Sequence, residues 1–277
     1  MKISGKTLES FAARLRTEER SPATVEKYCR EAGRFAAWLD SREADRELAL
    51  AYKAELAESR APAGINGAVA ALNRLFEMLE LPECRLRMVR VQRRIFRDEA
   101  RELTETEYRR LLSAARARKN ERLLLVMESI CATGIRVSEL RFFTVEAVRL
   151  GRAEVSNKGK TRTVFLPGRL QKKLARYAKQ RGIAAGPVFV TRNGRPLDRS
   201  NIWHEMKGLC REAGVAEEKV FPHNLRRLFA RIFYGLEKDI VRLADVLGHS
   251  SINTTRIYTM ESGLTHRRQL EKMRLVI

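Results

Sequence analysis

Residues 221–227 read Phe221-Pro222-His223-Asn224-Leu225-Arg226-Arg227 and place a histidine and an arginine one helical turn apart. Side chains at positions i and i+3 of a helix project from the same face, so His223 and Arg226 can converge on one small anion. Apolar spacing predicts a helix over 222–234, with His223, Arg226 and Arg227 turned away from its buried face. That buried face carries Leu225, Leu228, Phe229, Ile232 and Phe233.

A second histidine, a tyrosine and a further arginine complete a set suited to phosphoryl chemistry. His249 lies in Leu-Gly-His-Ser-Ser, Tyr258 follows it by nine residues, and Arg136 lies upstream in Ala-Thr-Gly-Ile-Arg-Val-Ser-Glu-Leu. An arginine grips two phosphate oxygens with its planar fork and keeps its proton at neutral pH. A tyrosine hydroxyl has a pKa of ~10, so its attack on phosphorus requires a nearby proton acceptor or cations. The pattern therefore predicts a site that holds one phosphate against a tyrosine nucleophile.

In wording, order and spacing these motifs resemble those of the tyrosine recombinase (phage integrase) family, specifically from Leu103 onward and weakly in the helical region before it. The resemblance implies a site-specific DNA recombinase, or integrase, that cleaves and rejoins strands through a 3′-phosphotyrosyl intermediate for integration, excision or resolution of DNA. The catalytic set that it implies is Arg136, Lys158, His223, Arg226, His249 and the nucleophile Tyr258.

One lysine of this set lies in a predicted hairpin and is the candidate general acid. A deoxyribose 5′ oxygen is a poor leaving group unless it is protonated as it departs. The family places its essential lysine in a β-turn, and Asn157-Lys158-Gly159-Lys160 resembles that turn. Lys158 matches the family pattern because it precedes the glycine, and Lys160 is the competing candidate.

The sequence departs from the family pattern at one position next to the catalytic set. The usual His-x-Leu-Arg-His box reads His-Asn-Leu-Arg-Arg here, so Arg227 stands where a histidine is common. The resemblance puts that histidine beside the essential set. We expect altered local packing or phosphate contact at Arg227, with activity retained.

The charge of the chain favours a polyanionic partner. There are 55 Lys plus Arg against 34 Asp plus Glu, and the net charge is +5 over residues 1–97 and +16 over residues 98–277. Six arginines between positions 85 and 97, without one carboxylate, repel one another unless an anion neutralises them. Together with the resemblance, this predicts double-stranded DNA as the partner. The predicted DNA-binding residues are Arg90, Arg93, Arg94, Arg97, Lys160, Arg162 and Arg227.

Helical periodicity dominates, so the predicted fold class is mainly α with a small β-sheet (α+β). Residues 1–97 are predicted to form a helical domain; the resemblance makes it a core-binding, SAM-like DNA-binding domain with a basic linker at its end. Residues 98–277 are predicted to form a mixed α/β catalytic domain with a C-terminal tail helix, and the family's two domains form a clamp around DNA. The predicted helices cover 7–16, 22–39, 45–58, 62–79, 105–117, 121–133, 169–181 and 222–234, with a hairpin over 155–166 and a short strand over 188–190.

Several other classes of protein lack support in the sequence. No apolar run approaches membrane-spanning length and no hydrophobic signal segment opens the chain, so we expect a cytoplasmic, nucleoid-associated protein. The four cysteines have no metal-ligand spacing, so reduced, buried thiols and no metal are expected. The chain has no phosphate-binding Gly-x-x-x-x-Gly-Lys loop, and the expected chemistry needs no cofactor.

Three alternative functions remain open at this point. A type IB topoisomerase uses nearly the same site to relax DNA, and only a recombinase needs defined paired sites. A non-catalytic DNA-binding regulator explains the charge but not Tyr258 in register with His249, Arg226 and Arg136. A metal-dependent nuclease is least favoured, since no clustered carboxylates for two metal ions are found.

The predicted partner arrangement follows from the resemblance and from the two ends of the chain. The helical domain begins almost at residue 1, which leaves no room for an extra arm-binding domain and favours inverted-repeat core sites. Family members assemble as tetramers on paired sites, so we expect a homotetramer there, a monomer when free, and accessory proteins as possible partners. Residues 263–277 are predicted as a short basic helix with an apolar tip that docks on a neighbouring subunit or on its own domain.

Overall fold

The computed structural model describes residues 2–91, 99–157, 159–191, 193–259, 267 and 270–273. The chain divides into two compact units, Met1–Arg93 and Arg94–Ile277. The boundary predicted after residue 97 falls among the undescribed residues 92–98, so its position stays a prediction. Within the described ranges, no helix is long and apolar enough to cross a membrane.

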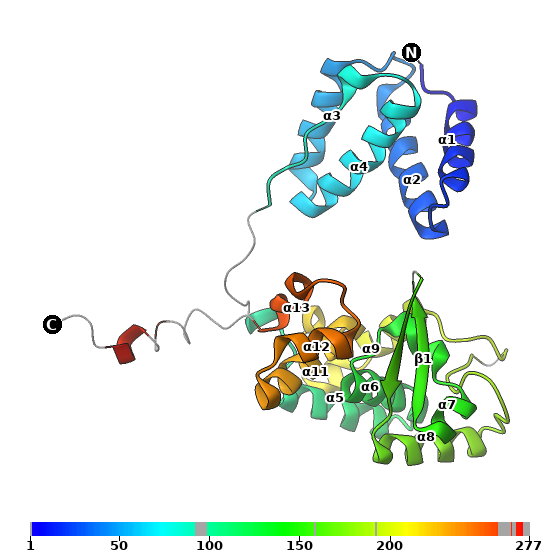
Figure 1. Ribbon diagram of the computed structural model, residues 1–277, viewed down its shortest axis with the longest axis vertical. Coiled ribbons are helices and arrows are strands. Elements are labelled where there is room, and N and C mark those ends of the chain that lie inside the picture. Colours follow the sequence, from blue (N-terminus) through cyan, green and yellow to red (C-terminus); the bar gives the residue numbers. More distant parts are fainter. Residues whose placement is uncertain are drawn as a thin grey trace. The chain divides into compact units, whose positions relative to one another are not determined.

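The first unit is a helical bundle whose helices begin at local capping signals. Its elements are α1 (Gly5–Thr17), α2 (Pro22–Leu39), α3 (Arg46–Ser59), α4 (Pro62–Met78) and a 3-10 turn at Pro82–Cys84 (Figure 1). Ser4 caps α1 in a capping box with Thr7, and Ser21 caps α2 with Pro22 at the first helical position. The aromatic ring of Phe35 packs 5.1 Å from that of Tyr52 in the core between these helices. The helices predicted for this part of the chain are confirmed to within a few residues at each end.

Two asparagines of α4 hold the segment after the bundle in an extended form. The Asn73 amide donates to the carbonyl of Leu86 (2.9 Å) and accepts from its N–H (2.8 Å). Asn66 makes the same pair of hydrogen bonds with Val89, at 3.0 and 2.8 Å. Because both backbone groups of each residue are satisfied, the extended segment 86–89 belongs to the first unit. Arg90 follows it and is exposed.

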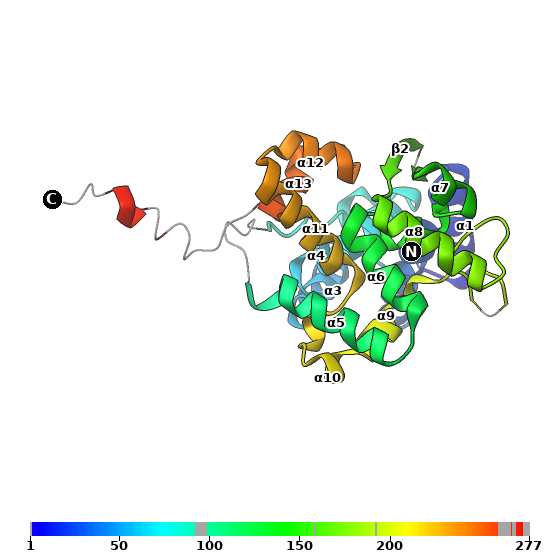
Figure 2. The same ribbon diagram turned by 90° about the horizontal axis from the view of Figure 1, so that it is seen from below.

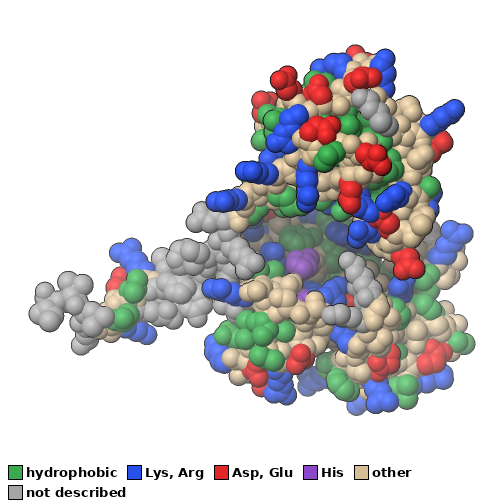
Figure 3. Space-filling model, turned by 45° about the horizontal axis from the view of Figure 1, so that its top comes forward, with side chains coloured by type: hydrophobic (Ala, Val, Ile, Leu, Met, Phe, Trp, Pro, Cys, Tyr) green, Lys and Arg blue, Asp and Glu red, His purple; other side chains and the backbone are tan. Residues whose placement is uncertain are grey.

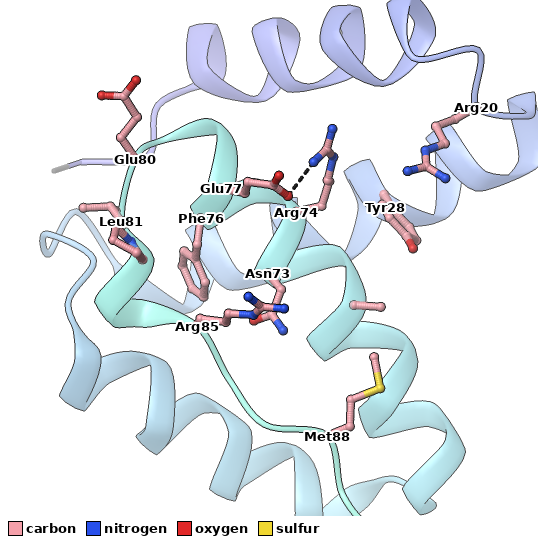
Figure 4. Close-up of a pocket in the computed structure, with 12 residues that line it drawn as sticks. Arg20, Tyr28, Asn73, Arg74, Phe76, Glu77, Glu80, Leu81, Arg85 and Met88 are labelled. Atoms are coloured by element: carbon pink, nitrogen blue, oxygen red, sulfur yellow. Dashed lines mark hydrogen bonds and ion pairs between the residues drawn. The ribbon is translucent and has the colours of Figure 1, made fainter.

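The first unit also has a pocket beside this segment. Figure 4 shows Arg20 and Tyr28 on one side of it and Asn73, Arg74 and Arg85 among the side chains that line the rest. Basic and acidic side chains mix over the visible face of the unit (Figure 3). Arg74 forms ion pairs with Glu77, which also lines the pocket, and with Glu18. None of the predicted catalytic residues that the structure describes lines this pocket.

The second unit surrounds a two-stranded antiparallel sheet with helices (Figures 1 and 2). Its elements are α5 (Glu105–Ala117), α6 (Glu121–Thr133), α7 (Val145–Leu150), β1 (Arg152–Asn157), β2 (Lys160–Phe165), α8 (Gly168–Gln180), α9 (Arg199–Lys207), α10 (Cys210–Ala213), α11 (Pro222–Glu237), α12 (Ile240–Leu247) and α13 (Ile252–Thr259), with 3-10 turns at Glu99–Arg101, Val137–Phe142 and Glu217–Lys219. The register of the hairpin runs from Arg152 opposite Phe165 to Asn157 opposite Lys160. The predicted hairpin and the mainly α fold class with a small sheet are confirmed.

Helix α6 is the centre of this unit. It carries Leu123, Val126, Met127 and Ile130 in the core, and α5, α8 and α11 pack against it. Thr104 and Glu107 form a capping box at the start of α5. Gly134, in the left-handed conformation, ends α6, and Gly248 ends α12 in the same way. The chain turns at both glycines, and Arg136, which follows Gly134, reaches the carbonyl of Gly248.

Two sequence predictions are wrong in this unit. Residues 188–190 form no strand: Thr144 bridges Pro187 and Val190 bridges Pro196 as isolated pairs. Neighbouring N–H groups that would extend the two ladders bond elsewhere, that of Phe143 to the carbonyl of Leu140 and that of Arg195 to the hydroxyl of Thr191. In α11, Ile232 is 42% exposed whereas Arg226 is only 2% exposed, so the helix turns Arg226 inward instead of toward a free surface.

Two further expectations concern the cysteines and the tail. The cysteines are free, and Cys84 and Cys210 are buried, whereas Cys29 and Cys131 are half-buried. In the described part of the chain, no group of three or more His, Cys, Asp or Glu side chains is placed to hold a metal ion. Of the predicted tail helix over 263–277, residues 267 and 270–273 are helical, and the rest lies outside the described residues.

Candidate active site

The guanidinium of Arg226 is held by backbone carbonyls at the ends of two helices. One of its Nη atoms donates to the carbonyl of Gly134 at the end of α6, and the other donates to the carbonyl of Leu247 at the end of α12 (2.7 Å). Helix C-termini carry partial negative charge, which stabilises a cation there. Burial, with a further contribution from the charge of Arg136, lowers the pKa of Arg226 to about 10. The side chain therefore remains a cation at neutral pH.

Arg136 is fixed by Glu139, one turn along the 3-10 segment. The Glu139 carboxylate accepts from the backbone N–H of Arg136 (2.9 Å) and from its Nη1 (2.8 Å), while Nη2 of Arg136 reaches the carbonyl of Gly248 (3.3 Å). Arg162 on β2 donates to the same carboxylate at 2.9 Å. Burial acts to raise the pKa of Glu139, but the hydrogen bonds from Arg136 and the charge of Arg162 outweigh it and lower the pKa. Glu139 is therefore an anion shared by two arginines.

His249 connects Arg226 to α13. Its Nε2 lies 3.1 Å from Nη2 of Arg226, and its Nδ1 lies 2.9 Å from the hydroxyl of Thr255. Half-burial of the ring and the charges of Arg226 and Arg136 lower the pKa of His249 to about 4. The imidazole is therefore neutral at pH 7.

Tyr258 lies between the two histidines. Its hydroxyl is 3.4 Å from Nε2 of His223, and its ring stacks on that of His249 with centroids 5.8 Å apart and planes inclined by 23°. The tyrosine is only 5% exposed. It comes from α13, whereas His223 comes from the first turn of α11, and α11 and α13 pack against each other.

His223 is the most exposed member of this group, yet the protein around its ring removes much of its hydration. This desolvation, followed by the charges of Arg227 and Arg226, lowers the pKa of His223 to about 4. Exposed surface alone suggests a well-hydrated ring, but several cations converge on it and disfavour a further proton. At neutral pH the ring is neutral and can accept a proton at one nitrogen.

The structure brings five of the predicted catalytic residues into one cluster: Arg136, His223, Arg226, His249 and Tyr258. Lys158 lies outside the described residues, as do Arg93, Arg94 and Arg97 of the predicted DNA-binding set. Lys160 begins β2, and its side chain is not described. Arg162 lies inside the cluster with its guanidinium on Glu139, and the charge of Arg227 acts on His223.

Two members of the cluster were missed from the sequence. Glu139 follows Arg136 by three residues, a spacing that indicates a local ion pair once the segment is known to be a helical turn. Thr255 is completely buried, and its hydroxyl meets His249, which depends on the packing of α13. The sequence gives no local signal for that contact, because Thr254 and Thr255 are adjacent and identical, yet Thr254 is exposed.

Comparison with known proteins shows the family of the chain. A sequence model of the Phage integrase family matches residues 101–263. The chain is 30% identical to the tyrosine recombinase XerA of Thermococcus kodakarensis in a match that covers 100% of this chain and 98% of that protein. The predicted resemblance therefore extends over the whole chain.

Solved structures agree as well. The crystal structure of XerA recombinase matches with a TM-score of 0.53 and 25% identity over 98% of this chain and 99% of that one. A lambda integrase dimer bound to a COC′ core site matches with a TM-score of 0.75 over 94% of this chain and 96% of that one, and at 17% identity it supports the fold alone. The chain belongs to the phage integrase family of tyrosine recombinases, the enzymes that cleave and rejoin DNA.

Proposed function

We propose that this chain is a site-specific DNA recombinase in which Tyr258 attacks the DNA backbone and forms a 3′-phosphotyrosyl intermediate. The observation that carries the proposal is the position of the Tyr258 hydroxyl, 3.4 Å from Nε2 of His223. Arg226 and Arg136 belong to the same cluster. Arg226 is held by backbone carbonyls and Arg136 by Glu139, so both guanidinium groups are oriented before any phosphate binds. Such fixed positive charge is what a phosphoryl transition state requires.

The cleavage step assigns roles to the nucleophile, to the two histidines and to Arg136 and Arg226. The phenolic oxygen of Tyr258 forms a bond to phosphorus, the bond from phosphorus to the 5′ oxygen breaks, and the phenolic proton passes to neutral His223. Arg136 and Arg226 hold the non-bridging oxygens as negative charge develops on them, while His249 contacts Nη2 of Arg226 and stacks on the ring of Tyr258. In the rejoining step a 5′ hydroxyl attacks the phosphotyrosine and releases the tyrosine, so the bond energy is conserved and no cofactor is consumed.

Lys158 is the proposed general acid that gives a proton to the departing 5′ oxygen. It lies outside the described residues, but its neighbours support the assignment. Asn157 pairs with Lys160 across the hairpin, and Lys158 follows Asn157 in the sequence. Arg162, two residues beyond the start of β2, bonds to Glu139 in the cluster. This ion pair connects the hairpin to the candidate active site.

The proposed partner is double-stranded DNA with inverted-repeat core sites. We assign backbone contacts to Arg90, Arg93, Arg94, Arg97, Lys160 and Arg227, with residues 1–97 as the core-binding domain. Arg162 is assigned differently: its guanidinium is occupied by Glu139, so it supports the frame of the site instead of contacting DNA. We place the protein in the cytoplasm, on the nucleoid.

Assembly on DNA is proposed to be a homotetramer on paired sites, with a monomer when free and with accessory proteins as further partners. Leu270 and Met273 of the tail are 67% and 55% exposed, which favours their docking on another subunit. Deletion of residues 264–277 is expected to leave binding to a single site intact and to abolish paired-site complexes on native gels. Normal strand exchange by the truncated protein would assign the tail to its own domain.

A plasmid assay tests the proposed function against DNA relaxation by a topoisomerase. Candidate core sites come from the DNA that flanks the coding gene, and plasmids carry two copies, one copy or none. We expect recombinant products only with two copies. Relaxation of plasmids of all three kinds at the same rate, without recombinants, would favour the topoisomerase and refute site-specific recombination.

A further inference from the structure

The hydroxyl of Thr255 is the contact that the cleavage scheme above leaves without a role. Thr255 is 0% exposed, and its Oγ1 lies 2.9 Å from Nδ1 of His249. A buried hydroxyl can donate to an imidazole nitrogen or accept from it, so the direction of this hydrogen bond depends on which ring nitrogen carries the proton. The contact therefore bears on the chemistry of His249 as well as on the packing of α13.

The other ring nitrogen determines the direction of this hydrogen bond. Nη2 of Arg226 lies 3.1 Å from Nε2 of His249, and a guanidinium only donates. Nε2 must therefore accept, which leaves the proton of the neutral ring on Nδ1. The Nδ1–H then donates to the hydroxyl oxygen of Thr255. The tautomer of His249 follows from its two neighbours.

The same contact joins the nucleophile's helix to the arginine pair. Thr255 and Tyr258 are three residues apart on α13, so they lie on one face of that helix. Tyr258 stacks on the ring of His249 while Thr255 bonds its edge. A rotation of the imidazole would break both contacts, so the ring, the hydroxyl and the nucleophile share one position.

We propose that Thr255 is a positioning residue, which fixes the orientation of the His249 ring and its Nδ1–H tautomer and thereby aligns His249 and Tyr258 with Arg226. The hydroxyl acts through His249 and touches no reacting atom. The role of this alignment in cleavage rests on the proposed function, whereas the tautomer in the free protein does not.

Nitrogen NMR of the free protein with ¹⁵N-labelled histidine tests the tautomer directly. We expect His249, assigned by comparison with His249→Gln, to show a protonated Nδ1 and an unprotonated Nε2. Thr255→Val keeps the shape but lacks the hydroxyl and is expected to give a mixture of tautomers, whereas Thr255→Ser restores the parent spectrum. Thr254→Val removes the neighbouring exposed hydroxyl and is the matched control, with no change expected. A protonated Nε2 in the parent protein, or an unchanged spectrum for Thr255→Val, would overturn the proposal.

The rate of covalent complex formation on a nicked suicide substrate then tests the consequence. Loss of one hydrogen bond at the site is expected to slow Thr255→Val about tenfold, with DNA affinity and melting temperature close to those of Thr254→Val. Thr255→Ser is expected to recover the rate. If Thr255→Val does not fold, Thr255→Ala takes its place. An equal loss of rate in the serine variant would reduce Thr255 to a packing role. If the parent protein forms no adduct at all, the proposed function fails, while the NMR spectrum still decides the tautomer.

Discussion

The backbone of Gly248 lies directly against the side chain of Arg162: a Cβ on residue 248 would stand 2.4 Å from Cδ and 2.7 Å from Nε of Arg162. Arg162 cannot move aside freely, because its guanidinium is paired with Glu139 at 2.9 Å. Gly248 also ends α12 with a φ of +64°, a conformation that favours glycine. The hairpin, the 3-10 turn after α6 and the end of α12 are thereby held in contact around Arg136.

Substitution of Gly248 distinguishes two contributions to the free energy of unfolding, one from the close contact with Arg162 and one from the left-handed backbone. Gly248→Ala is expected to lower the free energy of unfolding by about 1–2 kcal/mol for the left-handed backbone, and by at least about 1 kcal/mol more for displacing Arg162 from Glu139. Gly159→Ala is the matched control, since φ is +75° there and a Cβ meets nothing within 4 Å. Urea unfolding measures both variants, and equal losses would show that the contact with Arg162 carries no energy.

The two histidines of the site predict a pH dependence of stability. Their pKa values in the folded protein are lowered to about 4, while an unfolded histidine takes up a proton near pH 6.5. Between these values the unfolded chain binds more protons, so their contribution to stability is complete above pH 6.5 and is lost as the pH falls toward 4.

Urea unfolding from pH 4.5 to 7.5 checks this prediction. The free energy of unfolding is expected to rise with pH across this range. In His223→Asn the rise is expected to be smaller than in the parent protein. A parent slope in His223→Asn would contradict the lowered pKa of His223.

Substitution of Arg226 tests its double attachment to helix ends. Arg226→Lys keeps the charge but cannot bond the carbonyls of Gly134 and Leu247 with a planar fork. Covalent complex formation is expected to fall on the order of 100-fold or more. Arg242→Lys, which changes an arginine of α12 that is paired with Glu237, is expected to leave the rate unchanged. A rate within a few-fold of the parent for Arg226→Lys would show that charge alone suffices.

The role of Lys158 is separable from that of the arginines by the chemistry of the leaving group. A 5′-bridging sulfur departs without a proton, so this substrate is expected to rescue Lys158→Ala but not Arg226→Ala. The measured quantity is the rate of adduct formation with the sulfur and oxygen substrates. Rescue of neither variant would remove the general-acid role, and rescue of Lys160→Ala alone would move the assignment two residues along the hairpin.

Local signals in the sequence predicted most helices and the catalytic motifs. Ser21-Pro22 and the Thr104–Glu107 capping box mark helix starts by contacts within one turn, so they are readable without tertiary structure. The direction of Arg226 was not readable in this way. Its carbonyl partners come from Gly134 and Leu247, far away in the chain, and helical periodicity alone places an arginine outward.

The same limit explains the other differences. Val188 and Phe189 are buried without pairing as a strand, and an apolar run in the sequence does not distinguish burial from strand pairing. Glu139 and Thr255 are recognised only when Arg162 and His249 are seen beside them. Chemistry-bearing residues were therefore predictable from motif spacing, whereas the residues that hold them in place depend on contacts between distant segments.

Mapping the covalently attached residue tests the central claim most directly. The parent protein is incubated with a nicked suicide substrate, the adduct is digested with protease, and mass spectrometry identifies the peptide that carries the nucleotide. We expect the modification on Tyr258, linked to the 3′-phosphate end of the broken strand, and no adduct from Tyr258→Phe although it binds DNA normally. An adduct that persists in Tyr258→Phe and maps to Tyr234 or another residue would contradict the account.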